Sequence, residues 1–310
     1  MHYTGTIWRP PYEAGSLLLE VTAGCTHHSC KFCSLYSDLP FRFRLTPLED
    51  VEADLREAQM LAADPMAHLS ARLLGVPRRQ IRRVFLVGAN PFALAFDRLK
   101  AITGLIRTYL PSCGSIGCFS RVTDIARKTD EELRDLRAMG FDGISIGAET
   151  GDPAALAFMN KGYTPEDIVL QARRLDEAGI SYHFMYLAGI SGAGRGAEGA
   201  LESARVFSQT HPRIIGSSML TVDRESQLYG EIQAGRWTEE SELEKLEELR
   251  ILIDHLDIPV YFATLGASNA VWVQGTLPED REAMTAHLEA ACRPENEAAL
   301  RRYRTTLPHL

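Results

Sequence analysis

Runs of nearly continuous apolar residues alternate along the chain with longer amphipathic segments. Six of these runs predict β-strands, at residues 16–21, 83–88, 115–120, 143–148, 182–187 and 214–222. Because the runs are apolar at almost every position, both faces of each strand should be buried, as in a parallel sheet. The segments between them are long enough for crossover helices. The pattern therefore predicts an α/β fold with six βα units between residue 16 and about residue 235.

Polar residues mark the boundaries of several predicted helices. Thr46, Thr129 and Thr164 each stand three residues before an acid, the spacing of a capping box, and a proline directly follows two of them. Gly140 and Gly179 follow amphipathic runs and come just before the next strand, where C′ glycines end helices. These signals support the alternation of helices and strands.

Two segments depart from this alternation. Residues 64–80 lengthen the first crossover and predict an inserted short helix, which is either an added surface helix or a lid over a substrate. After residue 236, a strongly charged helical stretch leads into an apolar segment and a last helix. We expect residues 1–236 to form the main domain and residues 237–310 to form a helical extension packed on it.

Composition and charge limit the class of protein and the partners that it can have. Apolar residues make up 45% and charged residues 24% of the 310 residues, as in ordinary globular proteins. The formal net charge of −8 opposes non-specific binding to nucleic acid. No run of eighteen apolar residues is present, and the N-terminal stretch lacks the basic-then-apolar order of a signal peptide. We therefore expect a cytoplasmic protein that binds neither nucleic acid nor membranes.

The strongest chemical signal is the stretch GCTHHSCKFCSLY at residues 24–36. It directly follows the first predicted strand, at the edge of a parallel sheet where chemistry is usually assembled. Three of the six cysteines of the chain lie in it, namely Cys25, Cys30 and Cys33. Disulfides are disfavoured, because a cytoplasm is reducing and bridges within so short a loop would be strained.

Two kinds of metal site remain for these cysteines. Zinc, with His27 or His28 as a further ligand, is one alternative, although structural zinc normally takes ligands from a second knuckle and the chain has no second CxxC. Three cysteines without a fourth favour a [4Fe-4S] cluster with one iron open to an exogenous ligand.

At this point the chain resembles the radical S-adenosylmethionine (radical SAM) superfamily. The usual motif of that family is CxxxCxxC with an aromatic residue before the last cysteine, and here Phe32 precedes Cys33. One extra residue separates Cys25 from Cys30. The resemblance extends over all six βα units and implies a partial (β/α)6 TIM-like barrel of parallel strands that binds a [4Fe-4S] cluster and S-adenosylmethionine (SAM).

The resemblance also implies contacts to SAM. The string after the second predicted strand falls where the family holds the methionyl amino group, with Asn90 in place of an acid. Glu149, at the end of the fourth strand, is a candidate for contacting the ribose hydroxyls or the methionyl group, with helix capping as its alternative role. Glycines after the fifth strand would let the backbone come close to the adenine side of SAM. The expected cofactor-binding residues are Phe32, Gly88, Ala89, Asn90, Glu149, Gly189 and Gly192.

Substrate residues are expected among polar side chains near the strands. The candidate catalytic residues are Arg121, His183 and Tyr186, and Arg42 or Arg44 could also line the cavity. His183 has a satisfied core histidine as its alternative. The other cysteines are expected to be buried bystanders, namely Cys113, Cys118 and Cys292.

The resemblance implies an enzyme that cleaves SAM reductively to a 5′-deoxyadenosyl radical, which abstracts hydrogen from a small molecule. A flavodoxin- or ferredoxin-type donor would supply the electron. The string TVDRESQLYGEI at residues 221–232 resembles a segment of relatives of oxygen-independent coproporphyrinogen oxidase, so a tetrapyrrole is one candidate substrate. A carrier of haem or another cofactor with little SAM cleavage, and a zinc protein, are the alternatives. The reaction subclass stays open.

Overall fold

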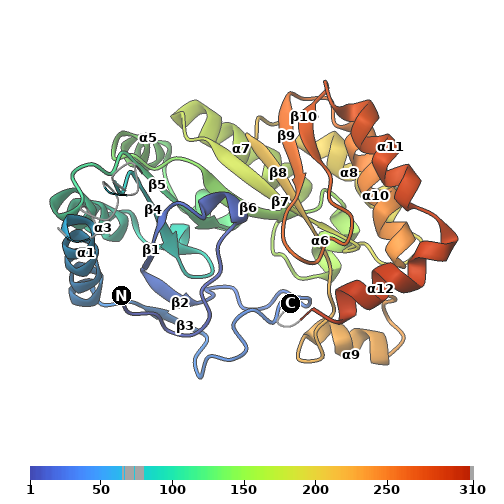
Figure 1. The fold of residues 1–310 in the computed structure, drawn as a ribbon, viewed down its shortest axis with the longest axis horizontal. Coiled ribbons are helices and arrows are strands. Elements are labelled where there is room, and N and C mark those ends of the chain that lie inside the picture. The colour runs from blue at the N-terminus through green and yellow to red at the C-terminus, as the bar shows by residue number, and fades with distance from the viewer. Residues whose placement is uncertain (65, 67–72, 74–79, 308–310) are drawn as a thin grey trace.

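An eight-stranded sheet forms the centre of the protein. The computed structural model describes residues 1–64, 66, 73 and 80–307. The strands follow one another across the sheet in chain order (Figure 1): β1 Leu17–Glu20, β4 Arg83–Val87, β5 Ser115–Ser120, β6 Ile144–Glu149, β7 Tyr182–Ala188, β8 Ile214–Met219, β9 Val260–Thr264 and β10 Gln274–Leu277. The first seven pair in parallel, and β10 runs antiparallel to β9. The edge strands β1 and β10 are not paired with each other among the described residues, so the barrel is open.

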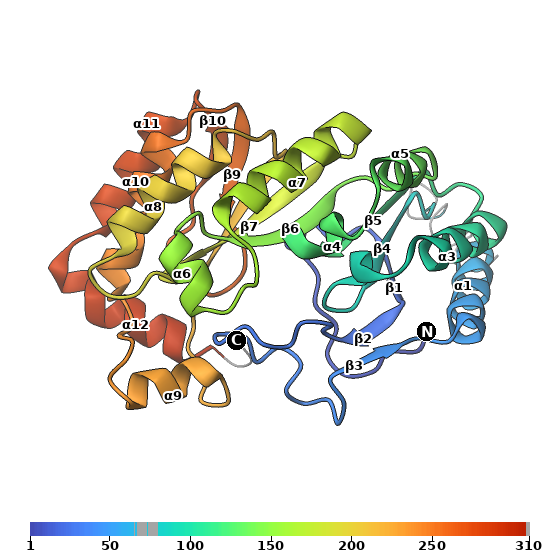
Figure 2. The ribbon, with the colours of Figure 1, turned by 180° about the vertical axis from the view of Figure 1, so that it is seen from behind.

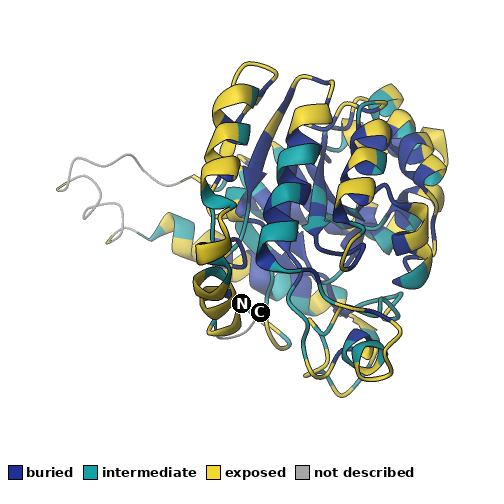
Figure 3. Ribbon diagram, turned by 90° about the vertical axis from the view of Figure 1, so that its right-hand side faces the viewer, coloured by how far each residue is buried: buried dark blue, intermediate teal, exposed yellow. Residues whose placement is uncertain are grey.

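Helices fill the connections and cover the outside of the curved sheet (Figures 1 and 2). They are α1 Leu48–Ala63, α3 Phe96–Tyr109, α4 Val122–Ala126, α5 Asp130–Ala138, α6 Pro153–Phe158, α7 Pro165–Ala178, α8 Gly196–Phe207, α9 Gln227–Gln233, α10 Glu242–His255, α11 Arg281–Ala291 and α12 Glu297–Thr305. The described residues also form three short 3-10 helices: η1 Pro11–Glu13, η2 Pro91–Ala93 and η3 Pro294–Asn296. The strands are buried, while the helices expose their outer faces (Figure 3).

Two of the three predicted capping boxes are confirmed. The hydroxyls of Thr129 and Thr164 accept from the backbone three residues on, at the starts of α5 and α7. The prediction for Thr46 is wrong, because Pro47 is the N-cap of α1 and the hydroxyl of Thr46 instead donates to Glu20 at 3.4 Å. A buried carboxylate at the end of β1 thus competes successfully for the hydroxyl.

Strand β7 shows how the two faces of the sheet are lined. Phe184 and Tyr186 point outward and pack against Phe207 of α8, with ring centroids 5.0 and 6.2 Å away. His183 points inward, where its ring and that of Tyr12 form a T-shaped pair with centroids 4.7 Å apart. Tyr12 belongs to η1, so the N-terminal segment lies across the inner face of the sheet near the start of the strands.

The C-terminal segment contributes strands as well as helices. All six predicted strands are present, but β9 and β10 also extend the sheet, because β9 pairs with β8 from Ile214 to Ser217. The extension after residue 236 is therefore not purely helical. Most of the inserted helix expected at residues 64–80 lies outside the described residues. No described helix has both the length and the apolar character needed to cross a membrane.

Candidate functional site

A short antiparallel ribbon carries the cysteine-rich loop. Strand β2 (Thr22–Gly24) continues from β1 and pairs with β3 (Phe43–Leu45), so residues 25–42 form the connection between them. The Cys25 amide donates to the carbonyl of Arg42 at 3.0 Å and closes the base of the loop. Gly24 has a φ of +76°, and a Cβ there would overlap the Arg42 carbonyl, so only glycine fits. Neither β2 nor β3 was predicted.

The first half of the loop is fixed by two asparagine residues. The buried Asn90 accepts from the Thr26 amide at 3.3 Å and donates to the Thr26 hydroxyl at 2.7 Å. Its amide also donates to Asp124 of α4 at 2.9 Å. Asn160 donates to the carbonyl of Ser29 at 3.0 Å. The Asn90 amide is therefore occupied in linking the loop to β4 and α4.

His27 and His28 point in different directions. Nε2 of His27 lies 2.6 Å from the carbonyl of Asn160, so this nitrogen carries the proton and donates. Burial lowers the pKa of His27, which favours this neutral form. His28 is exposed and has a φ of +47°.

The second half of the loop docks on α9 and the residues before it. Lys31 forms an ion pair with Glu231 at 2.9 Å, and its carbonyl accepts from the Leu228 amide at 2.7 Å. The hydroxyl of Ser34 donates to Asp223 at 3.0 Å. Phe32 packs against a small apolar cluster formed by residues of α6, α9 and their neighbours, namely Ala155, Met159, Ile190, Leu220, Leu228 and Trp237.

The three cysteines of the loop interact electrostatically. Cys25 and Cys30 are half-buried and Cys33 is exposed, and all six cysteines of the chain are free. Burial raises the pKa of Cys30, while the nearby cations of Lys161 and Arg121 act in the opposite sense. Removal from water by the surrounding protein, with charge on Cys30 and Cys25 acting in the same sense, raises the pKa of Cys33 to about 11. Each thiol therefore lies within electrostatic reach of the others.

A buried ion pair stands beside Cys30. Lys161 is 3% exposed, and its ammonium donates to Glu149 at 3.0 Å. The same ammonium lies 5.4 Å from the centre of the Phe32 ring. Burial acts to lower the pKa of Lys161, but the charge and hydrogen bond of Glu149, together with Tyr163 and Cys30, outweigh burial and raise the pKa, so the lysine is charged. Glu149 ends β6 with a φ of +63°, a conformation that non-glycine residues rarely adopt.

Arg121 is the predicted catalytic candidate that reaches this region. It is the N-cap of α4, and its guanidinium donates to the carbonyl of Lys161 and, at 2.9 Å, to the Thr123 hydroxyl. Its Nε is buried and has no partner among the described residues.

The structure does not bring His183 and Tyr186 to this site. His183 is the second residue of β7, at the opposite end of the strand from the cysteine loop, and burial lowers its pKa to about 4. The Tyr186 hydroxyl points to the helical layer, where it donates to the buried Glu248 of α10. Because side chains alternate along a strand, Tyr186 cannot share the inner face with His183.

The glycines predicted to admit SAM are divided between two places. Gly88 directly follows β4 and has a φ of +129°, and a Cβ there would lie 2.6 Å from the Thr22 carbonyl, beside the base of the loop. Ala89 follows it and is half-buried. Gly189 and Gly192 instead face the C-terminal segment, because a Cβ at these positions would meet Lys245 and Trp237, respectively.

Several residues that hold the site were missed from the sequence. They are Thr26, Asp124, Asn160, Lys161 and the acids Asp223, Glu225 and Glu231. The string MNKG at residues 159–162 follows the strand that carries Glu149, so a lysine at the start of a loop beside that acid was a usable signal.

Among the described residues, no three His, Cys, Asp or Glu side chains are grouped closely enough to hold a single metal ion.

Comparisons with solved structures show the fold. The radical SAM methyltransferase TsrM from Kitasatospora setae, solved with cobalamin and a [4Fe-4S] cluster, is similar with a TM-score of 0.54 and 20% identity over 71% of this chain and 39% of its own. Coproporphyrinogen III oxidase HemN from Escherichia coli, a radical SAM enzyme, gives a TM-score of 0.54 and 16% identity over 78% of this chain and 52% of its own.

Elp3 from Methanocaldococcus infernus gives a TM-score of 0.51 and 13% identity over 80% of this chain and 56% of its own. The chain thus spans roughly two fifths to just over half of the length of these three proteins.

No curated protein matches the chain. The family model of the radical SAM superfamily matches residues 19–192, which is more than half of the chain and extends from the second half of β1 to beyond the end of β7. The matched region contains the cysteine loop, Asn90, Arg121 and the Glu149–Lys161 pair. The chain therefore belongs to the radical SAM superfamily, whose members are enzymes.

Proposed function

We propose that this protein binds a [4Fe-4S] cluster through Cys25, Cys30 and Cys33 and uses it to cleave SAM reductively. The single observation that carries the proposal is that these three free thiols lie together on one loop at the sheet edge, within reach of one another's charge. Lys161 and Arg121 favour the thiolate form of Cys30, which is the form that ligates iron. The donor set therefore fits the cluster.

When bound, the cluster would supply the electron that breaks a carbon–sulfur bond of SAM and yields a 5′-deoxyadenosyl radical. The residues of the chain would hold and shield the reactants. Phe32, packed on its apolar cluster, would exclude water from one side of the loop. The Glu149–Lys161 pair offers a carboxylate and an ammonium to the oppositely charged groups of a zwitterionic ligand. Arg121 would fix the backbone of Lys161.

We propose that hydrogen is then abstracted from a small molecule, with the reductant a flavodoxin- or ferredoxin-type protein. A tetrapyrrole remains a candidate substrate through the likeness of residues 221–232 noted above. In the structure these residues include the start of α9 and the side chains that hold the cysteine loop. Residues 221–232 therefore help to hold the cysteine loop of the proposed site. The substrate itself is to be identified by activity assays.

Anaerobic reconstitution with iron and sulfide tests the proposal. The wild-type chain should bind about four irons per chain, turn brown, and release 5′-deoxyadenosine and methionine from SAM after reduction. Cys30→Ala should abolish both the colour and SAM cleavage. Cys113→Ala is the matched control, because Cys113 is buried near β5 away from the loop, and it should retain both.

Full cleavage by Cys30→Ala would overturn the proposal. A colourless protein that binds one zinc would also overturn it and favour the zinc alternative. Tight haem binding without SAM cleavage would favour the carrier alternative.

A further inference from the structure

We infer that the C-terminal helix α12 is a clamp that positions the second half of the cysteine loop, with Arg304 as the positioning residue. The inference deepens the proposed function, on which its consequence for a bound cluster rests. The structural claim concerns the loop itself and can be tested without a cluster.

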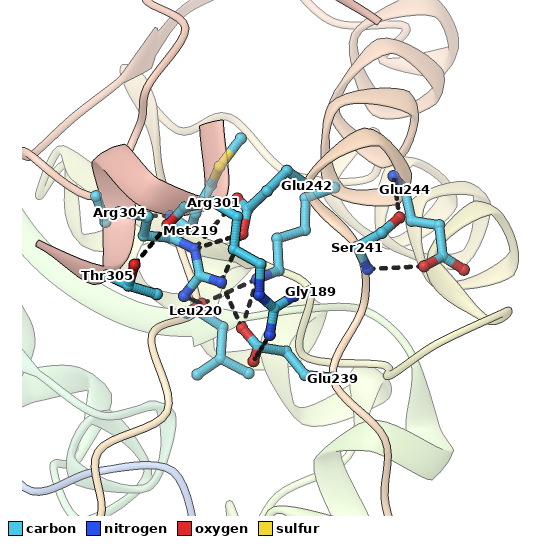
Figure 4. Close-up of polar contacts among 12 residues, drawn as sticks. Gly189, Met219, Leu220, Glu239, Ser241, Glu242, Glu244, Arg301, Arg304 and Thr305 are labelled. Carbon is cyan, nitrogen blue, oxygen red and sulfur yellow. Dashed lines mark hydrogen bonds and ion pairs between the residues drawn. The ribbon is translucent and has the colours of Figure 1, made fainter. Parts of the chain in front are cut away.

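Arg304 sits at the centre of a buried polar network (Figure 4). It is 2% exposed, and its Nε donates to both oxygens of Glu242, at 3.0 and 3.1 Å. One of its terminal nitrogens donates to Glu239 at 2.6 Å, and the other donates to the carbonyl of Leu220 at 3.1 Å. A guanidinium is needed here, because its donors leave in three directions from one plane.

Lys245 of α10 also donates to the carbonyl of Leu220. It is fully buried, and its ammonium donates to the carbonyl of Leu220 at 3.2 Å and to Glu239 at 2.9 Å. Its stem passes so close to Gly189 that a Cβ there would lie 2.7 Å from Cε. Two cations therefore meet at Leu220, the residue that directly follows β8.

The other end of α12 is attached as well. Glu297, the first residue of the helix, accepts from the backbone amides of Glu242 and Leu243 at 3.1 and 3.0 Å. These amides lie in the first turn of α10, where an anion is favourable. Helix α12 is thus bonded near both ends to elements that precede it in the chain.

Leu220 begins the stretch that holds the cysteine loop. From Asp223 to Glu231 this stretch makes four polar contacts to the loop segment from Lys31 to Ser37. That segment contains Cys33. The first half of the loop is held differently, by Asn90 and Asn160, and among the described residues no side-chain hydrogen bond joins either asparagine to α12. The clamp should therefore act on one half of the loop and leave the other in place.

Hydrogen–deuterium exchange of the cluster-free full chain, measured by mass spectrometry, tests this inference. Arg304→Met removes the donors while keeping an unbranched apolar side chain. We expect exchange to accelerate by about tenfold in peptides covering residues 220–231 and 31–37, the size that loss of such contacts produces, with little change in residues 24–29.

Arg83→Met is the matched control, because Arg83 forms a bidentate pair with the buried Glu13 near the start of the strands, and among the described residues no hydrogen bond or ion pair joins it to α9. Arg83→Met should destabilise the fold without selectively accelerating exchange in residues 220–231 and 31–37. If Arg304→Met does not fold, Ser34→Ala cuts the link at the loop and should accelerate exchange in residues 31–37 while leaving α12 unchanged.

Equal acceleration in both halves of the loop, or the same pattern in Arg83→Met, would refute the clamp. So would acceleration confined to α10 and α12. In the iron-loaded protein, Arg304→Met should release iron to a chelator about tenfold faster than Arg83→Met. Should the wild-type chain bind no iron while the exchange result holds, the proposed function fails and the clamp stands.

Discussion

The buried pair of Glu149 and Lys161 gives the sharpest test of how the site is held. Lys161→Met removes the ammonium 3.0 Å from the carboxylate and leaves Glu149, whose side chain is 15% exposed, without its cation. Removing one partner of a buried ion pair costs about 3–5 kcal/mol of unfolding free energy. Because Glu149 keeps some contact with water, we expect the lower end, about 3 kcal/mol. The methionine can still pack against Phe32 and Tyr163, so little of this loss comes from packing.

Urea unfolding of the cluster-free protein under reducing conditions measures this cost. Glu149→Gln and the double variant complete a mutant cycle, in which the two changes should couple by about 2 kcal/mol because the double variant leaves no unpaired charge. Lys100→Met, at an exposed position on α3, is the control and should change the unfolding free energy by less than about 0.5 kcal/mol. Additive effects within experimental error would show that the two side chains do not act as a pair.

Three further predictions concern the stability of the fold. Gly88→Ala should lower the unfolding free energy by about 2 kcal/mol or more, because the new Cβ would overlap the Thr22 hydroxyl at a φ of +129°. The control Gly104→Ala lies in open space on α3 and should raise the unfolding free energy by about 0.5–1 kcal/mol. Thermal melts compare the two variants. Burial raises the pKa of Glu240, and its neighbour Glu248 adds to the shift. The folded state therefore holds a proton that the unfolded state releases above pH 4.5, so stability should fall as pH rises from 5 to 8, by at most about 1.4 kcal/mol per unit, and this slope should flatten in Glu240→Gln. Burial lowers the pKa of His183 to about 4, so wild-type stability should be complete above pH 6.5 and fall toward pH 4 by up to about 3 kcal/mol, whereas His183→Gln should lack this loss; equal slopes in urea titrations would count against it.

The strands and the cysteine loop could be predicted because their signals are local. Continuous apolar runs located all six predicted strands, and the capping boxes at Thr129 and Thr164 located two helix starts. Strands β2 and β3 are three residues long, too short for a periodic pattern, and exist because the base of the loop closes between Cys25 and Arg42. Strand β9 was assigned to the extension because a charged helix precedes it, although its pairing is with β8.

The side chains of the site were harder to predict than its position. Both faces of each parallel strand are buried, so the sequence does not show that Tyr186 points to α8 and α10 while His183 points inward. Asn90 was expected at the methionyl group, and the structure occupies its amide with Thr26 and Asp124. Such assignments depend on contacts between residues that are far apart in the sequence.

The extra residue between Cys25 and Cys30 can be understood from the same contacts. His27 is held by the carbonyl of Asn160 and Ser29 by the side chain of Asn160, so the loop is fixed on both sides of His28. His28 itself is exposed and has a φ of +47°, and its amide lies 3.5 Å from the sulfur of Cys25. A single left-handed residue reverses the chain locally, so the additional residue projects into solvent while its neighbours stay on the protein. The chain between Cys25 and Cys30 therefore turns outward at His28, while Thr26 and Ser29, the neighbours of the two cysteines, are held by Asn90 and Asn160.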